Sequence, residues 1–214
     1  MLKIVLGNKK YSSWSLRPWL ALKMITGAPF EEQVVALDMP DSAQNIRKYS
    51  PSGRVPALID GALTVWDSIA ICEYLNEKFP QAGLWPADAG QRARARSISA
   101  EMHSGFMNLR NDCSMRIVEQ RPYKPLSAET QADVDRIVAI WNECLEKGGP
   151  WLFGAKPCAA DCMYAPVVSR FRTYSIPVSG AAKAYVDHVW AWPTLQDWVA
   201  GARAETLRAK FHED

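Results

Sequence analysis

The hydrophobic pattern near the start of the chain changes from a strand period to a helix period. Leu2, Ile4 and Leu6 stand at every second residue, which predicts a half-buried strand. The next apolar residues follow the spacing of one helix face, and this helix is expected to stop near Gly27. They are Leu16, Trp19, Leu20 and Met24. Residues 32–37 are predicted to form a second strand, and the polar residues 39–53 leave room for one short helix.

A hairpin signal follows this polar connection. Two short apolar runs, residues 57–59 and 63–66, are joined by Asp60-Gly61, a dipeptide typical of tight hairpin turns. Asp67-Ser68 then opens an apolar-periodic helix that is expected to end at Phe79-Pro80. The predicted order of elements is therefore strand, helix, strand, a loop, and then two strands and a helix.

The second half of the chain has no convincing strand pattern. Residues 80–90 contain two prolines and two glycines and are predicted to be a linker between a first domain of residues 1–79 and a second of residues 91–214. In the second domain we predict one long helix over residues 92–118, bent near Gly105. Further helices are predicted over residues 130–145, 161–174, 181–189 and 194–204.

Composition excludes several classes of function. A net charge of +2 with scattered basic residues gives no reason to expect a nucleic-acid partner. No apolar run approaches the roughly 20 residues that span a bilayer, and the first residues lack a signal-peptide pattern, so we expect a cytoplasmic protein without a membrane partner. An odd number of cysteines, no Cys-x-x-Cys and three scattered histidines predict neither disulfides nor a metal site.

The order of these parts resembles the glutathione S-transferase family, and the resemblance covers nearly the whole chain. It implies an α/β thioredoxin-like N-terminal domain and an all-α C-terminal domain. In this family the residue before a cis-proline holds the cysteinyl part of glutathione, and an acidic or amide residue followed by Ser holds its γ-glutamyl end. Val55-Pro56 and Asp67-Ser68 stand at these places.

The physical chemistry of the Asp67-Ser68 pair is compatible with that role. Backbone amides at a helix start are unpaired donors that can receive a carboxylate, while Asp67 can accept from an ammonium group. A simple N-cap is the competing interpretation of the pair. Lys48 and Arg54 flank the same loop and are candidates for the glycyl carboxylate of glutathione, although each would serve equally well as a solvated charge.

The chemistry implied by the resemblance is activation of the glutathione thiol. A free thiol has a pKa of about 8.5, so a hydroxyl that stabilises the thiolate is needed at neutral pH. The run Ser-Ser-Trp-Ser-Leu-Arg, residues 12–17, is similar to the Ser-Ser-Cys-Ser-x-Arg run of the zeta class, which includes maleylacetoacetate isomerase. Ser12 matches the thiolate-stabilising serine and Ser13 is its neighbour, while either could instead only cap the helix. Trp14 replaces the zeta-class cysteine, which leaves isomerase activity open.

The second substrate is expected between the two domains. Met102, Phe106, Met107 and Arg110 follow a helical spacing and would offer an apolar wall with one cation, although such a stripe also suits a core. Arg110 and Arg116 suggest a substrate that carries an anion or a carbonyl group.

The resemblance therefore implies a glutathione transferase for detoxification. Its thiolate would attack a small hydrophobic electrophile, and the protein would form a homodimer. Three alternatives remain: a glutathione-dependent peroxidase, an isomerase, or a binding module that kept the fold without catalysis. A thiol reductase is disfavoured because residues 11–15 contain no cysteine.

Overall fold

The N-terminal part of the protein is a four-stranded mixed sheet covered by helices. A computed structural model describes residues 1–25 and 29–207. The strands lie in the order β2-β1-β3-β4, with β1 parallel to β2 and antiparallel to β3, and β3 antiparallel to β4. Their bounds are β1 Leu2–Gly7, β2 Phe30–Val35, β3 Ala57–Asp60 and β4 Leu63–Trp66. This arrangement confirms the predicted thioredoxin-like fold of the N-terminal part.

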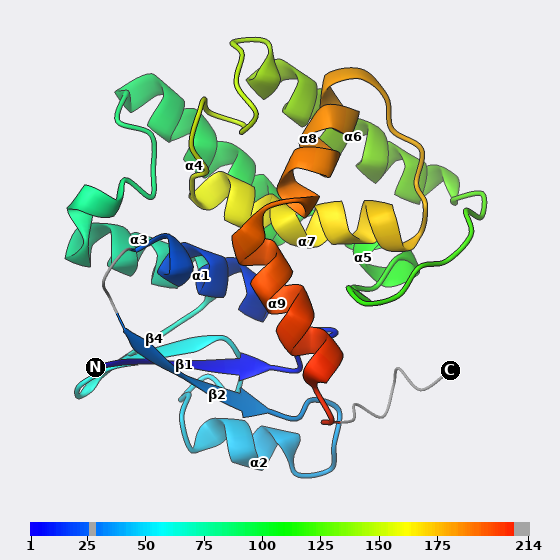
Figure 1. The fold of residues 1–214 in the computed structure, drawn as a ribbon. Coiled ribbons are helices and arrows are strands. Elements are labelled where there is room, and N and C mark those ends of the chain that lie inside the picture. The colour runs from blue at the N-terminus through cyan, green and yellow to red at the C-terminus, as the bar shows by residue number, and fades with distance from the viewer. Residues whose placement is uncertain (26–28, 208–214) are drawn as a thin grey trace.

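The side-chain alternation of β1 separates two apolar layers. Leu2, Ile4 and Leu6 face the main core, which α1 (Ser13–Met24) and α3 (Ser68–Lys78) complete. Val5 points to the opposite face and packs with Ile46 of α2 (Ser42–Arg47). Figure 1 shows α2 beneath the sheet and α1 above it. The strand and the short helix expected here are confirmed, whereas the predicted helix stop at Gly27 lies outside the described residues.

The second strand begins and ends two residues earlier than predicted. Phe30 pairs with Leu2, and pairing to β1 ends at Val35 instead of continuing to residue 37. The strand ends at Val35 because the backbone groups of the next two residues form hydrogen bonds with side chains and not with β1. The Asn8 amide oxygen accepts from the Leu37 N–H at 2.7 Å, and the Ser42 hydroxyl donates to the Ala36 carbonyl at 2.7 Å.

The hairpin and the helix after it form as predicted. β3 and β4 turn at Asp60-Gly61, where Gly61 has a φ of +60°. Val55-Pro56 is a cis peptide, as the resemblance implied. Asp67 caps α3, which ends before Phe79.

The C-terminal part of the described chain is helical. After the 3-10 turn η1 (Pro80–Ala82) the helices are α4 Ala89–Ser104, α5 Met107–Asp112, α6 Ala128–Leu145, α7 Ala159–Thr173, α8 Gly180–Trp190 and α9 Pro193–Ala204. The predicted all-α C-terminal domain is confirmed. The division of the chain at residues 79 and 91 stays a prediction.

The long helix predicted over residues 92–118 is wrong. The chain leaves the helix at Gly105, Phe106 adopts a left-handed conformation with a φ of +58°, and the residues after Asp112 are not helical. Arg110 stabilises this break because its guanidinium donates to the carbonyls of Gly105 and Met102. The sequence predicted only a bend at Gly105. The contact of Arg110 with the Gly105 carbonyl, five residues earlier, accompanies a complete end of α4 at this point.

Helix α7 is the centre of the common core. Fourteen of its fifteen residues are buried, and it packs against both α1 and α4. Buried Asp161 accepts hydrogen bonds from the Cys158 and Leu152 amides, at 2.8 and 3.1 Å, and from the Tyr185 hydroxyl at 3.0 Å. Its charge is therefore surrounded by donors, which is how a buried carboxylate is tolerated.

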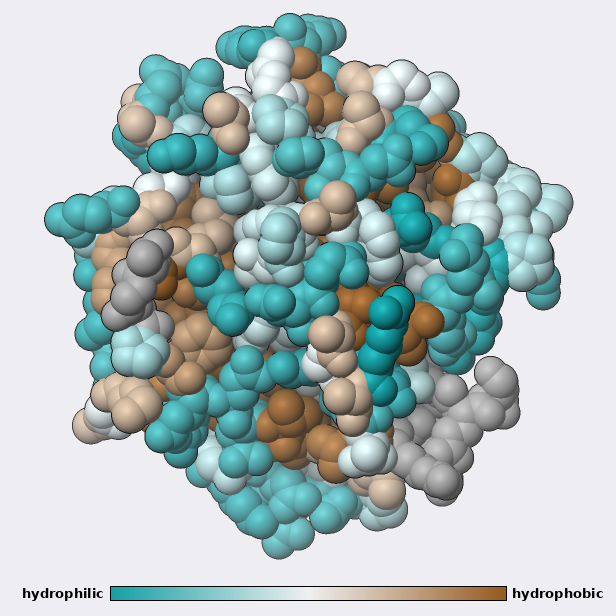
Figure 2. All heavy atoms as spheres, viewed as in Figure 1, coloured by the Kyte–Doolittle hydropathy of each residue, from teal (hydrophilic) through white to brown (hydrophobic). Residues whose placement is uncertain are grey.

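The face in Figure 2 is covered mainly by hydrophilic residues, with separate apolar patches between them. Within the described residues no helix combines the length and the apolar character needed to cross a bilayer.

Candidate active site

The first of two neighbouring cavities lies where the hairpin meets α4, and we call it the hairpin cavity. Its volume is about 600 Å³. It is lined by Trp14, Ser52, Arg54, Val55, Pro56, Trp66, Asp67, Ser68 and His103. The structure thus brings together five of the residues that the sequence nominated for glutathione binding: Arg54, Val55, Pro56, Asp67 and Ser68.

Asp67 has two functions in this cavity. One carboxylate oxygen, Oδ1, accepts from the amides of Ile69 and Ala70 at 2.9 and 3.4 Å, which is the N-cap interaction. The other, Oδ2, lies 3.1 Å from Nε2 of His103. Asp67 holds a φ of +76°, an unfavourable conformation for a residue with a Cβ. The cap interpretation is therefore correct, and the second oxygen is still placed to meet a cation.

His103 is a residue of the cavity that the sequence did not reveal. It comes from α4, its Nδ1 lies 3.5 Å from the buried Ser68 hydroxyl, and its ring meets Trp14 edge-on at 4.9 Å. Burial lowers the pKa of His103, and the nearby charges of Arg17 and Arg110 lower it further, against the opposing effect of Asp67. A lone histidine beside an apolar helix position carried no signal that distinguishes it from a surface residue.

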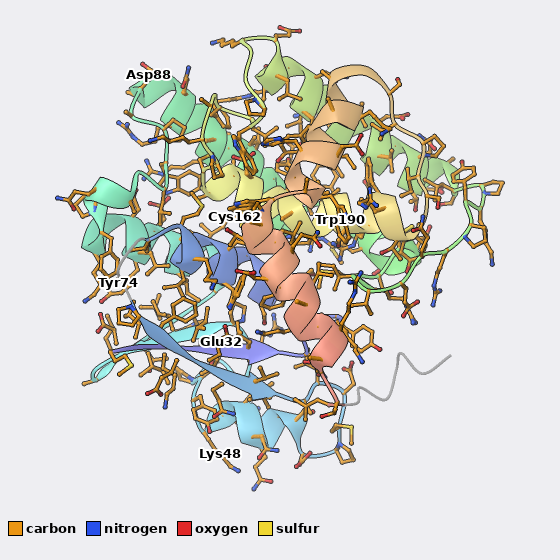
Figure 3. The ribbon with its side chains drawn as sticks, viewed as in Figure 1. Glu32, Lys48, Tyr74, Asp88, Cys162 and Trp190 are labelled. Atoms are coloured by element: carbon orange, nitrogen blue, oxygen red, sulfur yellow. The ribbon has the colours of Figure 1, made fainter. Side chains whose placement is uncertain are left out.

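Lys48 is not brought to the hairpin cavity. Its ammonium group donates to Asn45 at 2.8 Å, one turn earlier along the chain, and the side chain is exposed. Figure 3 shows Lys48 at the outer edge of the molecule, beyond α2. The structure therefore favours the solvated charge, which was the competing interpretation of Lys48.

The second cavity lies beside the loop that joins β1 to α1, and we call it the loop cavity. Its volume is about 330 Å³. It is lined by Tyr11, Ser12, Ser13, Trp14, Leu37, Met107, Arg110, Ser114, Met115 and Arg170. Trp14 lines both cavities, so a molecule in one lies next to a molecule in the other. Ser12, Ser13, Met107 and Arg110 are here, as the sequence suggested.

Two predicted lining residues are instead part of the core. Met102 is fully buried and Phe106 is 8% exposed, and neither lines a described cavity. Their helical stripe with Arg110 is interrupted because α4 ends before Gly105. Arg116 does not line the loop cavity either, and its guanidinium forms an ion pair with Glu119 at 3.1 Å.

The two serines have different surroundings. Ser12 is the N-cap of α1: its hydroxyl accepts from the Ser15 amide at 3.3 Å and donates to the Ser15 hydroxyl at 2.8 Å. The Ser13 hydroxyl lies 3.5 Å from a guanidinium nitrogen of Arg170. Both side chains are almost fully buried. The capping interpretation therefore holds for Ser12. The Ser13 hydroxyl accepts from Arg170, so its own proton is available to a ligand.

Three guanidinium groups gather around Trp14 and the loop cavity. Arg17 and Arg110 lie over the Trp14 ring at 4.4 and 4.8 Å from its centroid. Arg170 donates to the carbonyls of Cys113 and Pro166. Among the described residues none of the three forms a salt bridge to a carboxylate, and the fully buried guanidinium nitrogens of Arg17 have no hydrogen-bond partner.

The pKa values of Arg170 and Arg17 are lowered, mainly by burial and further by the charges of the neighbouring arginines. Burial lowers the pKa of Arg170 to about 10, and the charge of Arg110 adds to this effect. The pKa of Arg17 is lowered for the same two reasons, with Arg170 as a third. A negative group in the loop cavity would relieve this repulsion, so the site is suited to hold an anion.

The comparisons with known proteins agree with the fold. Residues 11–78 match the family model "Glutathione S-transferase, N-terminal domain" and residues 124–203 match "Glutathione S-transferase, C-terminal domain". Together these matches cover more than half of the chain.

Two curated relatives and one solved structure are representative. The dichloromethane dehalogenase of Methylorubrum extorquens is 51% identical over 182 residues, which are 79% of this chain but 61% of the dehalogenase. A probable maleylacetoacetate isomerase of Caenorhabditis elegans is 34% identical over 169 residues, covering 78% of this chain and 77% of the isomerase. The crystal structure of a glutathione transferase homolog from "Burkholderia gl BGR1", with bound glutathione, has a TM-score of 0.74 at 26% identity and covers 95% of this chain and 99% of its own.

Proposed function

The chain belongs to the glutathione S-transferase family, and from this premise we propose that it is a glutathione transferase. Glutathione would occupy the hairpin cavity, and its thiolate would attack an electrophilic carbon held in the loop cavity. The observation that carries this proposal is the shared wall at Trp14, which places the two cavities side by side. The solved relative with bound glutathione supports the choice of co-substrate.

The residues of the hairpin cavity fit the two ends of glutathione. Oδ2 of Asp67, which also faces His103, and the amides at the start of α3 are complementary to an ammonium and a carboxylate group, the pair that the γ-glutamyl end carries. Val55 and Pro56 line the cavity, and we assign the Val55 backbone to the cysteinyl backbone of glutathione. Arg54 is exposed and lines the same cavity, and we assign it to the glycyl carboxylate.

The serine pair is proposed to stabilise the thiolate. Lowering the pKa of the thiol by about two units needs a preference for the anion of roughly 2.7 kcal/mol. One hydrogen bond to a charged group contributes about 1.5–3 kcal/mol. A hydroxyl of Ser12 or Ser13 is therefore sufficient, and the nearby guanidinium of Arg170 adds a favourable charge.

A second candidate activity is the isomerisation of an unsaturated acid. It is favoured by Arg110 and Arg170, two cations in the loop cavity that form no salt bridge within the described part of the chain. A substrate carboxylate would supply the missing partner. The relative named as a probable maleylacetoacetate isomerase supports this candidate, and the tryptophan at position 14 in place of cysteine weighs against it.

The proposal includes a cytoplasmic homodimer. The five cysteines are free thiols in the structure, as is usual for proteins of a reducing compartment. Dimer formation is expected from the family and is tested by the mass of the protein in solution.

Calorimetric titration with glutathione tests the proposal most directly. We expect saturable binding that Ser68→Ala and Asp67→Ala each weaken strongly, while Lys48→Ala, which is outside the cavity, leaves it unchanged. A screen of neutral and carboxylate-bearing electrophiles, an unsaturated diacid and a peroxide then separates the transferase from the isomerase and the peroxidase. No binding by the native protein would refute the proposal and favour a non-catalytic module.

A further inference from the structure

The loop that carries the serine pair is held by its own backbone at one end. The carbonyl of Asn8 accepts from the amides of Tyr11 and Ser12, at 3.1 and 2.8 Å. These two bonds place Ser12 at the start of α1. The amides of Lys9 and Lys10 point out of this turn, so their partners must come from elsewhere in the chain.

Both outward amides are bound by one side chain from the far end of the protein. Oε1 of Glu205 accepts from the Lys9 amide at 2.8 Å, and Oε2 accepts from the Lys10 amide at 3.3 Å. Glu205 directly follows α9 and is half-buried. A carboxylate suits two adjacent donors because both of its oxygens accept, and hydrogen bonds to an ionised acceptor are stronger than neutral ones.

Other groups of α9 keep Glu205 in register with the loop. The indole N–H of Trp198 donates to the Lys9 carbonyl at 2.9 Å. The Lys9 ammonium lies over the rings of Trp19 and Trp198, at 5.4 and 5.3 Å from their centroids, and forms an ion pair with Glu32 at 2.5 Å. Gly201 leaves space for Lys9, because a Cβ at Gly201 would lie 3.1 Å from Lys9 Cδ.

The figures show the same arrangement on a larger scale. In Figure 1 α9 runs from the helical half down to the end of the sheet from which the β1–α1 loop leaves. Glu32, the ion-pair partner of Lys9, is labelled in Figure 3 and belongs to β2. Helix α9 thus connects the C-terminal end of the described chain to the loop that precedes Ser12.

We propose that Glu205 is a positioning residue for the thiolate site. Its carboxylate fixes the amides of Lys9 and Lys10, and through them the conformation in which Ser12 and Ser13 are presented to the loop cavity. This inference rests on the proposed function, because it assigns Glu205 to the activation of bound glutathione. Glu205 lines neither cavity, so it acts through the loop and not by contact with a substrate.

The variant Glu205→Gln tests this inference. Glutamine keeps the length of the side chain but replaces one acceptor oxygen by an NH₂ donor that faces an amide N–H. We expect the pKa of the bound thiol, followed by its ultraviolet thiolate absorbance, to rise by about one unit, which is a roughly tenfold loss of thiolate well below the pKa. Activity should fall by a similar factor at neutral pH and recover at higher pH. The dissociation constant for glutathione should change by less than about twofold.

The sign of the shift separates the alternatives. Loss of a nearby negative charge without any change in position would lower the pKa of the thiol, which is the opposite direction. A purely structural role would reduce the melting temperature and leave the pH profile unmoved. Either result would overturn the inference.

The matched control is Glu143→Gln, which also neutralises one carboxylate of the helical half, at an exposed ion pair with Arg94. It should leave the pKa of the thiol unchanged. If Glu205→Gln does not fold, Trp198→Phe removes the bond to the Lys9 carbonyl while keeping a ring, and it should raise the pKa in the same direction. A native protein without a thiolate band would refute the proposed function and the inference together, which distinguishes this result from a failure of Glu205 alone.

Discussion

The two cavities that meet at Trp14 are built in opposite ways. All but two of the residues lining the hairpin cavity come from one stretch, residues 52–68, and Trp14 and His103 complete it. The loop cavity is assembled from the β1–α1 loop and the start of α1, from Leu37 beyond β2, from the region of α5 and from a single arginine of α7. The hairpin cavity thus depends mainly on one local stretch of the chain, whereas the loop cavity depends on several segments that are distant from one another in the sequence.

The two cavities also differ in charge. The hairpin cavity has charges of both signs, the carboxylate of Asp67 and the guanidinium of Arg54, whereas the charged residues that line the loop cavity are Arg110 and Arg170. A zwitterionic end group fits the first and an anionic substrate fits the second. Variants that remove these charges one at a time test whether the two cavities bind these two different groups.

The largest effect is expected for Asp67→Ala in the hairpin cavity. It removes both the partner of an ammonium group and the cap of α3, so the affinity for glutathione should fall by about a hundredfold, which equals roughly 2.7 kcal/mol. Calorimetry measures the loss. Loss of the cap alone costs about 1 kcal/mol of stability, so the melting temperature should fall as well.

Asp67→Asn is the control for this experiment, because asparagine caps helices about as well as aspartate but carries no charge. It should keep the melting temperature and still lose most of the affinity. Full affinity in Asp67→Asn would show that the carboxylate serves the helix alone.

The next largest effect is expected from the serine pair. Replacing the thiolate-stabilising serine by alanine removes a hydrogen bond of about 1.5–3 kcal/mol to a charged group. The pKa of the bound thiol should then rise by about one to two units. Titration of the thiolate absorbance in Ser12→Ala and Ser13→Ala compares the two hydroxyls in one measurement.

The structure makes the outcome for each serine distinguishable. Ser12→Ala also removes the cap of α1 and should lower the melting temperature, whereas Ser13→Ala should not. If neither variant moves the pKa of the thiol, the serine pair is not the thiolate site.

A smaller and more selective effect is expected for Arg110→Met. It removes a cation from the loop cavity, so kcat/KM for a carboxylate-bearing electrophile should fall about tenfold relative to a neutral one, or roughly 1.4 kcal/mol. Comparing the two substrates in one variant cancels the loss of stability caused by the missing bonds at the end of α4. Equal losses for both substrates would remove Arg110 from substrate recognition.

The smallest effect is expected for His103→Gln and concerns pH. The pKa of His103 in the folded protein is below its usual value of about 6.5, mainly because of burial. As the pH falls through about 6.5 the unfolded chain takes up the proton first, so the folded state loses stability. The native protein should therefore lose melting temperature between about pH 7 and pH 5 more steeply than His103→Gln.

His188→Gln, on α8 and outside both cavities, is the matched control for replacing an imidazole by an amide. Parallel pH curves for the native protein and His103→Gln would show that His103 titrates as it does in the unfolded chain.

The contrast between the cavities also explains how far the sequence could predict the molecule. Asp60-Gly61 and Asp67-Ser68 act through neighbouring residues, so the hairpin and the start of α3 were predicted correctly. Five of the residues nominated for glutathione binding also lie together in one cavity. His103 reaches this cavity only because α4 packs beside α3, and no local pattern encodes that contact.

The errors have the same origin. The end of α4 depends on the Arg110 guanidinium taking carbonyls of an earlier turn, and the end of β2 depends on Asn8 and Ser42. Arg170 meets Ser13 across 157 positions in the chain. Side chains that bind backbone groups change the bounds of elements, and contacts between distant side chains assemble a cavity, without leaving a periodic signal in the sequence.

The burial of α1 has a consequence for the order of events during synthesis. Nine of its twelve residues are buried, and α7 covers the side of α1 that faces away from the sheet. The ribosome completes the four strands of the sheet long before it reaches residue 159, the start of α7. Until then the nascent sheet domain presents an uncovered apolar helix. We therefore expect the first half of the chain to expose one apolar side of α1, and to be prone to aggregation, until the second half covers it.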